Sequence, residues 1–153
     1  MQRIADPLSR PQHRKVGADL FNYTWSLLDR KSRTSEEDEE MLNAAHASRY
    51  HWGHAGTMLQ VSVGEWQISR VYSMLGRSEP ALHHAERCLD ISRKSRLGRF
   101  YLAYAYEGMA RASAVAGRRT ARDRYAREAR RLGNRIRDRD DRRMLLEDLA
   151  TIP

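Results

Sequence analysis

Apolar residues recur along this chain at the three- and four-residue spacing typical of helices, and no segment alternates apolar and polar residues as a half-buried strand does. Leu20, Leu27 and Leu28 form one apolar stripe, and the segment from Phe100 to Val115 is the most apolar part of the chain. Helices are predicted over residues 14–30, 35–55, 58–75, 78–97, 99–116, 119–135 and 140–150. The pattern therefore indicates an all-α protein of six to seven helices.

Capping residues mark several of the predicted helix starts. Thr34 and Glu37 have the spacing of a capping box, and the acidic run after Thr34 would lie at the positive end of the helix dipole. Ser62 and Glu65 have the same spacing. The third helix is therefore predicted to begin at either Met58 or Ser62.

The length of 153 residues is enough for one globular domain and too short for a large multidomain enzyme. We expect a single helical domain over residues 13–153, made of antiparallel hairpins and a short helix that caps the stack. The hairpins are predicted over residues 14–56, 58–97 and 99–136, and the capping helix over about 140–150. Pro7 and Pro11 predict an irregular lead-in over residues 1–12.

Two stretches of the chain share a pattern of large, small and turn residues. The first contains Ile68, Ser69, Tyr72, Gly76, Ala81 and Cys88, and the second contains Tyr106, Met109, Ala110, Gly117 and Ala129. This pattern resembles the tetratricopeptide repeat (TPR), which pairs an aromatic, a large apolar and a small residue on its first helix with a glycine at the turn. The resemblance implies hairpins stacked as a short TPR-like superhelix, in which small residues let paired helices approach closely.

The spacing of the two turn glycines departs from the TPR period. Gly76 and Gly117 are 41 residues apart, whereas the TPR period is about 34 residues. The surplus of seven corresponds to about two helical turns, so each helix keeps the side that faces its neighbour. A HEAT-like helical repeat has nearer to this period and is the alternative. The chain is also similar to small bacterial repeat-like proteins of unassigned function.

The TPR resemblance also implies a binding surface. In that family the first helix of each pair lines a concave groove that commonly binds extended peptides, and the corresponding residues here are Trp66, Arg70, Ser73, Tyr104, Glu107 and Arg111. Two guanidinium groups at equivalent positions, Arg70 and Arg111, would hold a carboxylate by charge-assisted hydrogen bonds. We therefore predict a binding or scaffold protein that recognises a peptide, a protein segment or a small acidic ligand. The alternative for Arg111 and Glu107 is a simple surface ion pair.

Residues 46–54 contain three of the six histidines, with a tyrosine and a tryptophan, and favour a different class of function. Acid–base groups of an enzyme or a small-molecule-binding protein would come from His46, Tyr50, His51 and Glu65. Ligands of a metal would come from His51, His54 and His84. Structural, hydrogen-bonded histidines are favoured over both, because the chain has no phosphate-binding glycine loop, nucleophile motif or metalloprotease motif. No cofactor and no catalysis are expected.

The chain carries a formal charge of +8, and 17 of its 28 basic residues lie between Arg93 and Arg143. This distribution supports a third hypothesis, RNA or DNA binding through the arginine-rich C-terminal third. A solvated helix face is favoured over it, because several arginines have acidic neighbours three or four residues away, as Arg131 has Glu128. A peptide or protein is therefore the preferred partner, and nucleic acid is the less favoured one.

Cys88 is the single cysteine, which excludes an internal disulfide and a cysteine-based zinc site, and its place on an apolar helix face predicts a core residue. The N-terminal residues contain no apolar core like that of a signal peptide, so we expect a cytoplasmic protein that binds no membrane. The apolar helix over residues 99–116 would also suit a homodimer interface.

Overall fold

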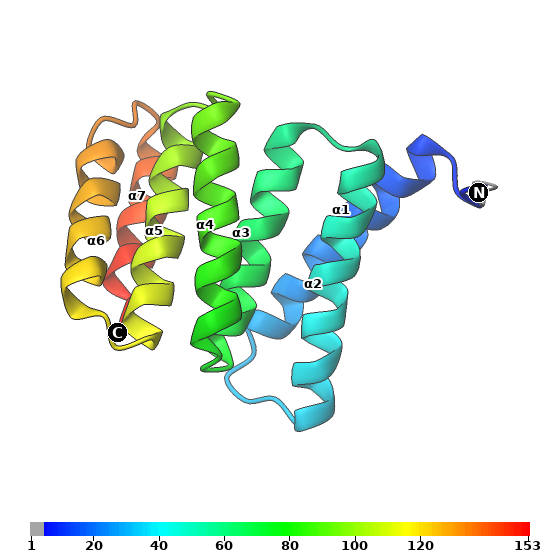
Figure 1. Cartoon of the computed structure of the whole chain (residues 1–153), viewed down its shortest axis with the longest axis horizontal. Coiled ribbons are helices and arrows are strands. Elements are labelled where there is room, and N and C mark those ends of the chain that lie inside the picture. Colours follow the sequence, from blue (N-terminus) through cyan, green and yellow to red (C-terminus); the bar gives the residue numbers. More distant parts are fainter. Residues whose placement is uncertain (1–4) are drawn as a thin grey trace.

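The computed structural model describes residues 5–153, and all regular structure in that range is helical. The helices are α1 (Arg10–Leu28), α2 (Ser35–Ala55), α3 (Met58–Met74), α4 (Ser78–Lys94), α5 (Arg99–Val115), α6 (Arg119–Gly133) and α7 (Arg139–Ala150). Three hairpins, α1–α2, α3–α4 and α5–α6, stand side by side, and α7 packs against α5 and α6 (Figure 1). The prediction of an all-α stack of helical hairpins is confirmed. Within these residues, no helix combines the length and the apolar character needed to cross a membrane.

The helices form two layers that differ in how closely neighbours approach. In the layer of α1, α3, α5 and α7, each helix has Cα atoms within 8 Å of the next. In the other layer, the described residues of α2, α4 and α6 make no such approach to one another. We call the surface formed by α1, α3, α5 and α7 the inner face.

The first helix begins earlier than the sequence pattern predicts. Ser9 and Gln12 form a capping box, so α1 begins at Arg10, inside the segment expected to be an irregular lead-in. Pro11 lies in the first turn, where its missing N–H leaves no hydrogen bond unmade. Pro11 is therefore compatible with a helix that begins at Arg10.

The capping box predicted for α2 is confirmed, but that of α3 differs from the expected one. Thr57 and Gln60 form it, and α3 begins at Met58. Ser62 and Glu65 lie inside the helix, and both are buried. The spacing of a capping box does not by itself fix where α3 begins, because Thr57 and Gln60 have it as well as Ser62 and Glu65.

The 41-residue period of the sequence is also the period of the helices. Helices α3 and α5 begin 41 residues apart, at residues 58 and 99, and α4 and α6 begin at residues 78 and 119. Gly76 and Gly117 end the first helix of each pair with φ angles of +70° and +71°, a left-handed conformation that favours glycine. The same backbone hydrogen bond closes both turns, with Arg77 donating to Tyr72 and Arg118 donating to Ser113, each at 2.9 Å.

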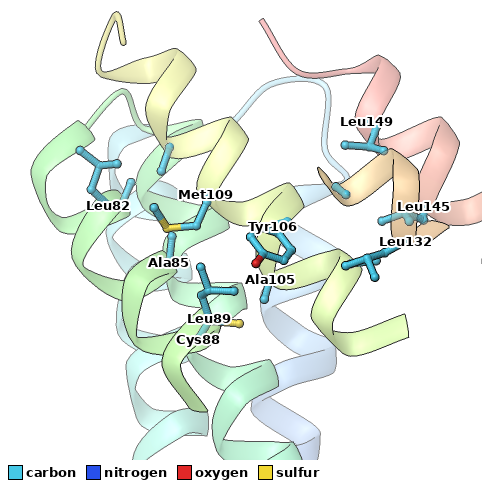
Figure 2. Packing of buried hydrophobic residues seen from close by; sticks show 14 of the residues in the cluster. Leu82, Ala85, Cys88, Leu89, Ala105, Tyr106, Met109, Leu132, Leu145 and Leu149 are labelled. Atoms are coloured by element: carbon cyan, nitrogen blue, oxygen red, sulfur yellow. The ribbon is translucent and has the colours of Figure 1, made fainter. Parts of the chain in front are cut away.

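Small residues bring the paired helices together around the larger apolar side chains. Ala110 and Ala129 have no exposed surface, and the Ser69 hydroxyl donates to the Ala81 carbonyl at 2.8 Å. The main core lies between α4, α5, α6 and α7 (Figure 2), and its larger members include Leu89, Tyr106, Met109, Leu132 and Leu145. Cys88 lies in this core, and burial raises the pKa of its thiol to about 11. A second core joins α1, α2 and α3 through Leu27, Leu28, Met41, Ala45, Ile68 and Val71.

Gly17 of α1 lies directly against the Trp52 ring of α2. A methyl group added to Gly17 would lie 2.5 Å from Trp52 Cδ1, so the two helices would have to move apart. We expect Gly17→Ala to lower the free energy of unfolding by about 1–3 kcal/mol in urea denaturation. Gly53→Ala is the matched control, because its added methyl meets only the flexible end of Arg49 and alanine favours a helix by about 1 kcal/mol. Equal effects of the two substitutions would contradict this close approach.

Candidate binding site on the inner face

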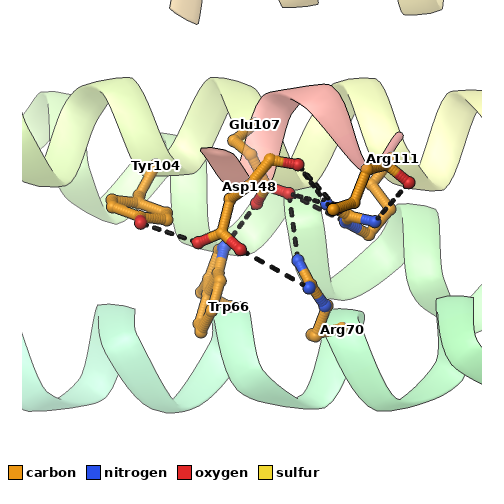
Figure 3. A network of polar contacts seen from close by, with 7 residues as sticks. Trp66, Arg70, Tyr104, Glu107, Arg111 and Asp148 are labelled. Carbon is orange, nitrogen blue, oxygen red and sulfur yellow. Dashed lines mark hydrogen bonds and ion pairs between the residues drawn. The ribbon is translucent and has the colours of Figure 1, made fainter. Parts of the chain in front are cut away.

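Three residues spaced 41 apart lie in a row across the inner face. Trp66 is on α3, Glu107 on α5 and Asp148 on α7. Because successive units follow the 41-residue period, these residues occupy equivalent positions, and their side chains come together (Figure 3). With their hydrogen-bonding and ion-pair partners they form what we call the polar cluster, which also contains Arg70, Tyr104, Arg111 and Thr151.

The Glu107 carboxylate is the centre of the polar cluster and has no exposed surface. It accepts hydrogen bonds from Trp66 Nε1 at 2.9 Å, from Arg70 Nη1 at 3.2 Å and from Arg111 Nε at 2.8 Å. A buried carboxylate is tolerated only where opposite charge and hydrogen bonds replace its lost hydration. Since the donors come from α3 and α5, Glu107 joins the second hairpin to the third.

Both arginines are held by the protein's own groups. Arg111 Nη2 donates to the Asp148 carbonyl at 2.9 Å and to Thr151 Oγ1 at 2.8 Å, at the C-terminal end of α7. Arg70 Nη2 lies 3.7 Å from Asp148 Oδ1. The two arginines therefore share the inner face, but the acidic groups they bind are Glu107 and Asp148. The ion pair of Arg111 with Glu107, at 2.7 Å, is buried and is no surface pair.

Tyr104 completes the polar cluster from α5. Its hydroxyl donates to Asp148 Oδ2 at 2.7 Å. Burial raises the pKa of Tyr104, and the hydrogen bond to the Asp148 carboxylate raises it further, so the phenol keeps its proton. Both oxygens of the Asp148 side chain are thus engaged, one by Tyr104 and the other by Arg70.

A cavity of about 380 Å³ lies on the inner face beside the polar cluster. Its lining residues come mainly from the four inner-layer helices and are Phe21, Trp25, Ser62, Val63, Trp66, Cys88, Phe100, Tyr101, Tyr104, Met144 and Asp148. Six of these eleven are aromatic, and Asp148 is the single charged one. The Trp66 ring contacts the rings of Trp25 and Tyr104, with centroid distances of 5.7 and 5.5 Å. We call this space the aromatic cavity.

Five of the six residues expected to line a groove belong to the polar cluster. They are Trp66, Arg70, Tyr104, Glu107 and Arg111, and Trp66 and Tyr104 also line the aromatic cavity. The sixth, Ser73, belongs to neither the cluster nor the cavity, since it is buried and its hydroxyl has no hydrogen-bond partner among the described residues.

Sequence reasoning missed several site residues, among them Asp148, Trp25 and Tyr101. One signal would have identified Asp148, because it continues by one more period the spacing from Trp66 to Glu107. No comparable signal marks Trp25 or Tyr101, since an aromatic residue on an apolar helix face has the same pattern in a core and in a cavity wall.

Glu65, His46 and His84 lie in a second polar cluster, between α2, α3 and α4. Glu65 accepts hydrogen bonds from His84 Nδ1 at 2.6 Å, from Arg49 Nε at 2.9 Å and from Arg87 Nε at 3.0 Å. Burial alone would raise the pKa of Glu65, but the hydrogen bonds from His84 and Arg87 outweigh it and lower the pKa to about 2. His46 contacts the Tyr72 hydroxyl at 3.0 Å. This carboxylate is an ionised structural group and does not line the aromatic cavity.

His51, His54 and Tyr50 lie elsewhere, at the C-terminal end of α2. His51 Nδ1 is 2.8 Å from His13 Nδ1 of α1, and the His54 ring stacks on His13. Tyr50 is exposed beside these rings. The structure thus divides the acid–base set His46, Tyr50, His51 and Glu65 between two clusters, and it separates His84 from the metal-ligand set of His51 and His54.

The arginine-rich C-terminal third forms local ion pairs along α6 and α7. Arg131 pairs with Glu128 three residues before it, and Arg143 with Asp140. Such pairs are typical of a solvated helix face.

The chain matches no protein-family model, no curated protein and no solved structure.

The central position of Glu107 leads to a stability prediction. Glu107→Gln leaves the buried Arg111 without its opposing carboxylate and the partly buried Arg70 with Asp148 alone, and breaking a buried pair in this way costs about 3–5 kcal/mol. Glu128→Gln is the control, because its pair with Arg131 is exposed and contributes at most about 1 kcal/mol. Urea denaturation followed by circular dichroism measures both losses. A loss for Glu107→Gln no larger than that of the control would be evidence against the polar cluster.

The low pKa of Glu65 leads to a prediction about pH. Its pKa of about 2 in the folded protein lies below the ordinary value of 4.5, so its contribution to stability is complete above pH 4.5 and is lost as pH falls toward 2. Over that window we expect the free energy of unfolding to fall by on the order of 2–3 kcal/mol more in the wild type than in Glu65→Gln. Denaturation curves at a series of pH values test this. Parallel pH profiles of the two proteins would show that Glu65 has an ordinary pKa.

Proposed function

We propose that this protein is a non-catalytic, TPR-like binding protein that receives a large apolar side chain of a partner segment in the aromatic cavity. The observation that carries the proposal is the lining of that cavity, where six aromatic residues from three helices surround about 380 Å³. Ligand sites commonly have volumes of about 300–1,000 Å³ and mostly apolar walls with a few polar groups.

The charges around the cavity support an apolar partner in preference to an acidic one. Asp148 is its single charged lining residue, and both carboxylate oxygens already have partners. Arg70 and Arg111 are directed to Glu107 and to the end of α7, so a ligand carboxylate would have to displace those bonds. An aromatic or aliphatic side chain needs no such displacement, because it gains by apolar contact with the rings.

The chemistry of the lining residues supports binding without catalysis. The Cys88 thiol lies in the cavity wall, but its pKa of about 11 keeps it protonated and unreactive at neutral pH. Its partner Ser62 is engaged with the Ser92 hydroxyl at 2.8 Å. Among the described residues, no histidine lines the cavity, and its one carboxylate, Asp148, is engaged by Tyr104 and Arg70.

Selection of peptides from a random phage-displayed library on the immobilised full chain tests the proposal. We expect the selected peptides to share one large apolar residue, and we expect Val63→Trp, which fills the cavity, to weaken their binding by roughly 10- to 100-fold. That range corresponds to the roughly 1.5–3 kcal/mol that burial of a large apolar side chain contributes. Met74→Trp is the matched control, because Met74 is an exposed residue of the same helix outside the cavity.

Two outcomes would overturn the proposal. The first is equal binding of the selected peptides to the wild type and to a folded Val63→Trp variant. The second is selection of peptides that share acidic residues, bind Val63→Trp as they bind the wild type and lose binding in Arg70→Gln, which would favour the hypothesis that Arg70 and Arg111 hold a ligand carboxylate.

A further inference from the structure

Three side chains that can bind metal converge at the far end of the first hairpin, away from the aromatic cavity. They are Asp6 from the segment before α1, His13 from α1 and His54 from the end of α2. Asp6 Oδ2 is 2.7 Å from His13 Nε2 and 3.3 Å from His54 Nδ1, and the three ligand atoms all lie within 4.8 Å of one another. His13 and His54 are 41 positions apart in the sequence, so only the folded hairpin brings them together.

We propose that Asp6, His13 and His54 bind a zinc ion. Ligand atoms about 2.0–2.1 Å from a tetrahedral zinc are about 3.3 Å from each other. The Asp6–His54 distance has that value already, and the Asp6–His13 distance reaches it with a shift of about 0.6 Å. Asp6 is exposed, so its side chain is free to make this shift, and the two histidine nitrogens lie within 4.8 Å of each other.

The donor set favours zinc over a hard cation. Two imidazole nitrogens with one carboxylate suit zinc, whereas calcium and magnesium prefer sites made of oxygen atoms. Asp6 and His54 are exposed, so water can complete the tetrahedron from the solvent side. His13 is 3% exposed and holds the inner position.

His51 acts as a positioning residue for His13. When Nε2 of His13 faces the ion, Nδ1 carries the proton and donates it to His51 Nδ1, 2.8 Å away. A second hydrogen bond of this kind fixes the tautomer and the ring orientation of a metal-binding histidine. The bound ion would tie the segment before α1 to the end of α2 and thereby hold together the open end of the hairpin.

The test uses the full, untagged chain after removal of metals with EDTA and dialysis. Zinc is titrated in competition with a chromophoric chelator, and we expect one zinc per chain. Asp6→Asn and His54→Gln should each weaken binding by about 100-fold or more, and His51→Gln by about 10- to 100-fold. Asp6 and His54 are chosen because they are exposed, so these variants keep the fold, whereas a change at buried His13 is avoided.

His83→Gln is the matched control, since His83 is an exposed histidine of α4 outside the cluster. It should bind zinc as the wild type does. Zinc should also raise the melting temperature of the wild type and of His83→Gln, and leave that of His54→Gln unchanged. The proposal is overturned if the wild type binds no zinc, or if Asp6→Asn and His54→Gln bind it with wild-type affinity.

Discussion

The buried carboxylate of Glu107 is the constraint on which the arrangement of the inner face depends. An ionised group without exposed surface needs donors on several sides, and here they come from Trp66 and Arg70 on one helix and from Arg111 on its own. The same two arginines also reach Asp148, on the last helix. One buried charge, with its donors, therefore sets the relative positions of α3, α5 and α7. The residues that meet there, Trp66, Glu107 and Asp148, follow the 41-residue period.

This use of the arginines changes the chemistry of the surface around them. In the open groove that the TPR resemblance implies, Arg70 and Arg111 would be available to an acidic ligand. With α7 in place they are neutralised by Glu107 and Asp148, and the adjoining surface that remains is aromatic. The last helix is thus more than a cap on the end of the stack, because it supplies the final member of the polar cluster and part of the wall of the aromatic cavity.

The histidines show how a sequence cluster and a spatial cluster differ. His46, His51 and His54 are close in sequence on one helix, but a helix directs neighbouring side chains to different sides. His46 consequently lies with Tyr72 and the Glu65 cluster, whereas His51 and His54 meet His13 of the preceding helix. Each of these imidazoles thus has partners from other helices, namely α3 and α4 for His46 and α1 for His51 and His54.

The sequence by itself determined the helical class, the helix number, most boundaries and the 41-residue period, because apolar spacing, capping residues and turn glycines act over a few residues. The resemblance to the TPR added the expectation that Trp66, Arg70, Glu107 and Arg111 lie on one face, since equivalent positions of a repeat face the same way. The same period marks Asp148, one more repeat after Glu107. Only the tertiary structure decided that Arg70 and Arg111 pair with the protein's own carboxylates and that aromatic residues surround a cavity. Those outcomes depend on how closely helices distant in sequence approach, and local patterns do not encode that distance.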